Sequence, residues 1–240
     1  MPPRSTRSSR IAGHRPSPES SRRRRPPWPW LIAAGLAVVL GLVLPGRCGP
    51  PPLSAPRIGL VAGHWQSDSG ATCPDGWREV DITLPVARRV VDQLRQLGYQ
   101  AEVLPEYADA LPGYRALAFV SLHADSCLAE FTGFKVASRN WGPAAETSAR
   151  LATVLTRRYA AATGLQYHQN TVTTAMTHYH AFFLVGPHTP AVIVELGFMG
   201  GDRELLTVQQ DRLAQGIVEG LLEFLSAEGV PPPATPTAAR

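Results

Sequence analysis

The sequence has 240 residues, of which 44% are hydrophobic, which is enough for one globular domain with tails. Its formal net charge of +4 arises in the first 27 residues, which hold eight Arg and one Glu; the rest holds 15 basic and 18 acidic residues. The basic character therefore belongs to a tail, and the composition argues against a nucleic-acid-binding domain.

Residues 1–27 are rich in Pro, Ser and Arg, which predicts a disordered cytoplasmic tail. Residues 28–45 follow the run Arg22–Arg25 and are uncharged and apolar, with Trp28 and Trp30 at one edge. This pattern predicts a single transmembrane or signal-anchor segment that leaves the rest of the chain outside the cell membrane. A cleaved signal peptide and a secreted protein are the alternative, because an apolar run of this length also suits an h-region.

A Pro-rich linker at residues 46–56 and a disordered tail at 229–240 flank a body of domain size at 57–228. Pro85 requires that its helix begin near residues 81–84, because proline is tolerated in a first turn. Expected strands cover 57–63, 100–104, 117–124, 133–138, 181–186 and 191–198. Expected helices cover 81–98, 144–164 and 211–229. The alternation predicts an α/β fold with a mostly parallel central sheet and helices on both faces.

Polar residues at the ends of these strands are the candidates for chemistry, because binding sites of open α/β sheets gather at strand carboxyl ends. His64 follows the first strand, His123 ends the central one, and Glu195 lies inside the last one. Two imidazoles and a carboxylate such as Glu79 make a catalytic zinc site with one open position. Each residue also has a plainer interpretation: Glu79 could favour a helix N-terminus through the helix dipole. An unpaired Glu195 is harder to explain, since burying it is costly.

The segments "GLVAGH", "FVSLHAD", "GFKV" and "PAVIVELGFMGGDRELL" resemble the family-3 type of zinc-dependent N-acetylmuramoyl-L-alanine amidase, a peptidoglycan hydrolase. The resemblance spans roughly residues 57–226. It implies that His64, Glu79 and His123 bind one zinc ion and that Glu195 is the catalytic carboxylate. It also implies hydrolysis of the amide bond between N-acetylmuramic acid and L-alanine.

Some positions depart from the family pattern and concern the substrate more than the metal. Trp65 follows His64 where the family usually has glycine, and Asp125 replaces the usual asparagine. Arg115 is the best remnant of an arginine-rich helix common in the family, and His180 lies in "THYHAFF". We expect Trp65, Asp125, Arg115 and His180 to contact substrate, with the alternative that His180 replaces one of the proposed ligands.

Cys73 and Cys127 both lie close in sequence to proposed ligands. In an exported protein they could form a disulfide that clamps the rim of the site, or remain two free thiols. Sequence does not decide between these alternatives.

Two other functions remain open. A different zinc peptidase would need a compact HExxH or HxxE ligand pair, and the sequence has neither. A membrane-tethered, inactive module that binds the wall or regulates a partner would be expected to lack a ligand or the catalytic carboxylate, yet all four residues are present. The expected partners are peptidoglycan and the membrane, through residues 28–45. The segment between "GFKV" and the final strands is too short for a long autoinhibitory insert. We therefore expect the activity to be controlled by membrane tethering or by a protein activator.

Overall fold

The computed structural model describes residues 57–233. The predicted cytoplasmic tail, membrane segment and linker, and residues 234–240 of the C-terminal tail, lie outside the described residues. Within residues 57–233, no helix combines the length and apolar character that crossing a membrane requires.

The centre of the fold is a sheet with the strand order β2-β1-β3-β5-β4. Its strands are β1 (Arg57–Ala62), β2 (Gln100–Leu104), β3 (Ala118–Asp125), β4 (Lys135–Ser138) and β5 (Ala191–Phe198). β1 pairs in parallel with β2 and β3, and β3 with β5, whereas β4 is antiparallel to β5. The prediction of a mostly parallel sheet is confirmed.

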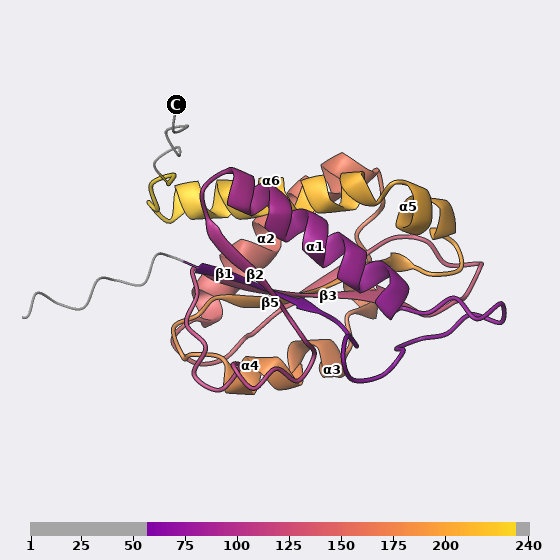
Figure 1. Cartoon of the computed structure of the whole chain (residues 1–240), viewed down its shortest axis with the longest axis horizontal. Coiled ribbons are helices and arrows are strands. Elements are labelled where there is room, and N and C mark those ends of the chain that lie inside the picture. The colour runs from indigo at the N-terminus through magenta and orange to yellow at the C-terminus, as the bar shows by residue number, and fades with distance from the viewer. Residues whose placement is uncertain (1–56, 234–240) are drawn as a thin grey trace, which may run out of the picture. The chain divides into compact units, whose positions relative to one another are not determined.

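Helices cover both faces of the sheet, as predicted, but unequally (Figure 1). The three long helices lie together on one face: α1 (Val80–Gln96), α2 (Ala145–Thr163) and α6 (Gln210–Ala227). The other face carries α3 (Thr174–Thr177) and α4 (His180–Leu184). The remaining helices are the short η1 (Gln169–Thr171) and α5 (Arg203–Val208), which precedes α6.

Side-chain alternation along the strands decides which face carries the candidate residues. In β3, Val120 and Leu122 pack into the core beneath the long helices, whereas Phe119 packs into the core on the opposite face. His123 has the same parity as Phe119, and Glu195 is its partner in the register of β3 with β5. Both therefore point to the face that α3 and α4 cover.

Two local predictions were wrong. The expected strand at residues 181–186 is instead the helix α4, in which Phe182 is buried and Phe183 is exposed. A short apolar run does not by itself distinguish a strand from a buried helical turn. Helix α1 begins at Val80, before the predicted start, so Pro85 lies inside the helix and beyond its first turn.

Candidate active site

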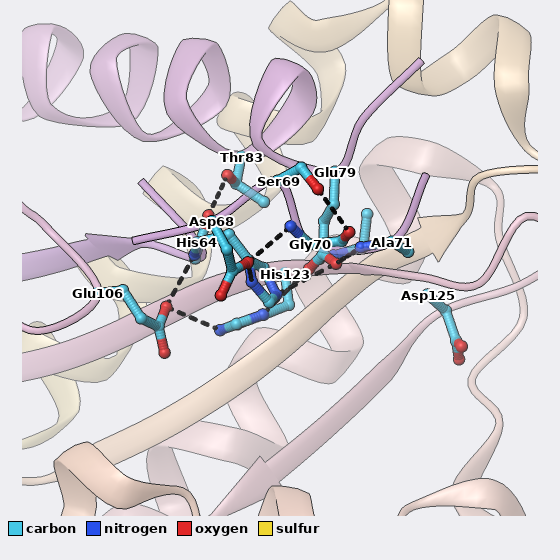
Figure 2. Close-up of polar contacts among 12 residues, drawn as sticks. His64, Asp68, Ser69, Gly70, Ala71, Glu79, Thr83, Glu106, His123 and Asp125 are labelled. Atoms are coloured by element: carbon cyan, nitrogen blue, oxygen red, sulfur yellow. Dashed lines mark hydrogen bonds and ion pairs between the residues drawn. The ribbon is translucent and has the colours of Figure 1, made fainter. Parts of the chain in front are cut away.

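Three proposed ligands from separate segments meet at the carboxyl edge of the sheet (Figure 2). His64 follows β1, Glu79 directly precedes α1, and His123 lies near the end of β3. His64 Nε2 lies 3.2 Å from Glu79 Oε2, and His123 Nδ1 lies 3.0 Å from Glu79 Oε1. One ligand atom from each residue lies within 4.8 Å of the others, a spacing that could hold a metal ion.

Two glycines permit this close approach. A Cβ atom at Gly63 would lie 2.6 Å from His123 Cε1, and one at Gly70 would lie 2.5 Å from Glu79 Oε2. His64 itself has a φ of 66°, in the left-handed region that few non-glycine residues adopt. The backbone around the ligands is therefore shaped so that their side chains can meet.

The carboxylate of Glu79 remains ionised, which suits a divalent cation. Burial opposes ionisation of Glu79, but hydrogen bonds from His123 and His64 and from the backbone N–H of Ala124 hold its pKa well below its usual range. Hydrogen bonding to Glu79 raises the pKa of His64 to about 9, against the effect of burial. A buried carboxylate between two imidazoles is a donor set that suits zinc, and binding a metal at such ligands requires neutral imidazoles.

The surroundings of Glu195 differ from those of Glu79, which receives several hydrogen bonds. It pairs in register with His123 on the neighbouring strand, and its Oε2 is shielded from solvent without a hydrogen-bond partner among residues 57–233. Burial raises its pKa to about 7, opposed by the charge of His123 and reinforced by that of Glu79. A carboxylate with such a pKa can accept and release a proton near neutrality.

A partly buried ion pair lies beside Glu195. Lys135 is opposite Glu195 in the antiparallel pairing of β4 with β5, so His123, Glu195 and Lys135 form a row across three strands. The ammonium of Lys135 pairs with the carboxylate of Asp125, and Lys135 is only 7% exposed. Figure 2 shows Asp125 apart from the ligand cluster. Sequence reasoning assigned Lys135 no role.

The other predicted substrate contacts fall in different places. Trp65 is partly buried against the core directly after His64. His180 lies in α4 with its Nε2 2.7 Å from Glu106. Arg115 precedes the amino end of β3, whereas His123 lies near the carboxyl end of the same strand. The structure therefore does not bring Arg115 to the ligands.

Glu106 is a buried residue of the site that sequence reasoning missed. It lies two residues after β2, and one of its oxygens reaches the backbone N–H of His64. The rule that drew attention to His64 and His123, a polar residue at a strand's carboxyl end, would also have found Glu106.

A disulfide joins Cys73 to Cys127, with the two Cα atoms 5.3 Å apart. Cys73 lies in the loop between His64 and Glu79, and Cys127 follows the strand that carries His123. The bond therefore ties the loop between His64 and Glu79 to the segment that follows His123.

Comparison with known proteins agrees with this geometry. Residues 58–223 match the Amidase_3 family of N-acetylmuramoyl-L-alanine amidases. The chain belongs to this family. The resemblance seen in the sequence is thus confirmed, and membership supports a peptidoglycan amidase, a hydrolase of the cell wall. A search of curated proteins found no match.

Solved structures of amidases share the fold. The catalytic domain of CwlV, an N-acetylmuramoyl-L-alanine amidase from Bacillus (Paenibacillus) polymyxa var. colistinus, is 25% identical with a TM-score of 0.54, and the match covers 71% of this chain and 98% of that one. Ami1 from Mycobacterium smegmatis is 22% identical with a TM-score of 0.56, over 72% and 97% of the two chains. The CwlD amidase from Clostridioides difficile, solved in complex with the GerS lipoprotein, is 19% identical with a TM-score of 0.55, over 72% and 99%.

Removing the disulfide should destabilise the protein. The bond closes a loop with a sequence separation of 54 residues. Replacing Cys73 and Cys127 together by serine should lower the free energy of unfolding by about 2 to 4 kcal/mol, because the unfolded chain gains conformational freedom. Urea denaturation of the metal-free protein measures this, with Cys48→Ser as the control. An unchanged midpoint for the double variant would contradict the expectation.

Glu195 should make stability depend on pH. Its pKa of about 7 in the folded protein exceeds the ordinary 4.5, so the stability linked to its protonation is fully present below pH 4.5 and is lost as the pH rises through 7. In the metal-free protein, Glu195→Gln should therefore exceed the wild type in stability at pH 8, by on the order of 3 kcal/mol. Urea titrations at several pH values test this; a difference independent of pH would contradict it.

Proposed function

We propose that this chain is a zinc-dependent N-acetylmuramoyl-L-alanine amidase. It hydrolyses the amide bond between the lactyl group of N-acetylmuramic acid and the L-alanine of the stem peptide. The observation that carries the proposal is the convergence of His64, Glu79 and His123 beside a buried Glu195. Membership of the amidase family supports the reaction class.

His64, Glu79 and His123 would hold the zinc ion. When bound, zinc supplies Lewis acidity toward the scissile carbonyl and lowers the pKa of water toward about 7. Glu195 takes a proton from the attacking water and delivers it to the leaving nitrogen of L-alanine, which then departs as an amine. Both transfers are accessible because burial raises the pKa of Glu195 to about 7. The positive charge of Lys135 opposes part of that rise and keeps the carboxylate able to ionise.

Substrate contacts follow from the surroundings of this centre. Trp65 lies next to His64 and is partly exposed, so we assign it to the rim, where its indole can stack on a sugar ring. The carboxylate of Asp125 forms an ion pair with Lys135, so we assign its effect on substrate to that pair. His180 remains partly exposed while it contacts Glu106, so part of its ring is accessible to substrate.

The proposed location is the outer side of the cell membrane, with residues 28–45 as a single-pass anchor and the N-terminus in the cytoplasm. The apolar run after four arginines supports this orientation. The Cys73–Cys127 disulfide supports it independently, because such bonds persist in oxidising compartments. Cleavage of the segment and secretion would place the catalytic domain in the same compartment.

The full-length chain should release stem peptides with new L-alanine amino termini from peptidoglycan. Glu195→Gln should lower the rate by about 100-fold or more, because the proton carrier is lost. Bound zinc should stay near one ion per chain in this variant, and chelation should abolish release by the wild type. Liquid chromatography of the released peptides and metal analysis measure these outcomes.

Glu204→Gln is the matched control, because Glu204 is exposed on α5 and its side chain contacts Gln209 and none of the proposed ligands. Its rate should equal that of the wild type. A wild-type chain that holds zinc and releases no peptide, even with a candidate activator added, would favour the wall-binding module. A chain that binds no zinc would rule out both the ligand assignment and the mechanism.

A further inference from the structure

Glu106 contacts both histidines of the ligand set. Its side chain is buried, with 5% of the residue exposed. Glu106 Oε2 accepts a hydrogen bond from the backbone N–H of His64 at 2.9 Å and lies 3.6 Å from His123 Nε2 (Figure 2). One carboxylate oxygen therefore lies between two ligands, of which one follows β1 and the other lies in β3.

Glu106 is itself held in place by several groups. Its Oε1 accepts hydrogen bonds from the Tyr179 hydroxyl at 2.8 Å and from His180 Nε2 at 2.7 Å. Its backbone N–H donates to the carbonyl of Trp65 at 3.1 Å. Such a carboxylate, buried and held from both oxygens, has a defined orientation toward the histidines.

The two histidines have matching surroundings. Each directs one ring nitrogen toward Glu79 and the other toward a second carboxylate. For His64 the second carboxylate is Asp68, whose Oδ1 lies 2.6 Å from Nδ1. For His123 it is Glu106, and His123 Nε2 has no hydrogen-bond partner within the described part of the chain.

This pattern is that of metal-binding histidines. A histidine that ligates a metal through one nitrogen commonly donates its other N–H to a carboxylate, which fixes the ring and its tautomer. The Asp68 side chain is 61% exposed, so solvent screens its effect, whereas Glu106 is buried and acts in a medium of lower dielectric constant. Glu106 is therefore the one of the two carboxylates whose charge solvent screens less.

We propose that Glu106 is a positioning residue for the metal centre. It fixes the backbone of His64 by a hydrogen bond and places a carboxylate 3.6 Å from His123 Nε2, so that both imidazoles face the position between them and Glu79. The inference rests on the proposed zinc site and adds to it a residue that does not itself bind zinc or substrate.

Zinc affinity tests the proposal without reference to activity. In the full-length chain, Glu106→Gln should raise the dissociation constant for zinc by about 10- to 100-fold, because the carboxylate that orients His123 is lost. Competition with a chromophoric chelator at fixed pH measures the constant. The visible absorption spectrum of the cobalt-substituted variant should also shift, because it reports the geometry of the ligands.

Glu102→Gln is the matched control. Glu102 Oε1 accepts a hydrogen bond from the Tyr114 hydroxyl at 2.7 Å, as Glu106 accepts one from the Tyr179 hydroxyl. Glu102, however, lies within β2 and forms an ion pair with Arg57. The substitution removes the negative charge of a similarly bonded carboxylate away from the ligands. It should leave both the zinc affinity and the cobalt spectrum as in the wild type.

The outcomes separate this inference from the proposed function. If the wild type binds zinc and Glu106→Gln binds it within threefold as tightly with an unchanged cobalt spectrum, the positioning role is refuted while the amidase remains. A lower melting temperature with unchanged affinity would likewise assign Glu106 to stability alone and overturn the inference. If Glu106→Gln weakens zinc binding but the wild type never cleaves peptidoglycan, the positioning role is supported and the proposed function is contradicted. A wild type that binds no zinc would refute both.

Discussion

The buried carboxylate of Glu79 is the constraint on which the site depends. An ionised carboxylate shielded from water must be compensated by hydrogen bonds or opposite charge. Here His64 and His123 contribute their imidazoles, and the backbone N–H groups of Ala71 and Ala124 contribute the rest. These donors come from the ends of β1 and β3 and from the loop between β1 and α1. Satisfying one charge therefore brings the ends of two strands and the start of a helix to a single point.

Two glutamates of the same site have different chemistry because their surroundings differ. Glu79 receives hydrogen bonds from both sides, and its pKa falls well below the usual range. Glu195 has an oxygen without a partner among residues 57–233, and burial raises its pKa to about 7. Environments that separate the pKa values of neighbouring carboxyl groups divide their roles, one remaining an anion and the other carrying protons. This division supports Glu79 as the ligand and Glu195 as the proton carrier.

Much of this arrangement is encoded locally and could be predicted from the sequence. Helices and strands place hydrophobic residues at different intervals along the chain, because their backbone geometries differ. The presence and order of the long helices and the strands therefore follow from the sequence pattern. His64, His123 and Glu195 could be identified because each lies at or within an apolar strand that would bring it to the same edge. Where the periodic signal was too short, as at residues 181–186, the prediction of a strand was wrong.

Contacts between distant segments were decided by the tertiary structure. The pairing of Cys73 with Cys127 was an open alternative in the sequence, and the reach of Glu106 to His64 spans 42 residues. Likewise, Arg115 is close in sequence to β3 but lies before its amino end, away from the ligands at its carboxyl end. A sequence pattern reports which face or end of an element a residue occupies, because that depends on the local backbone. Which two elements then touch depends on packing and register across the whole sheet, and that information is not local.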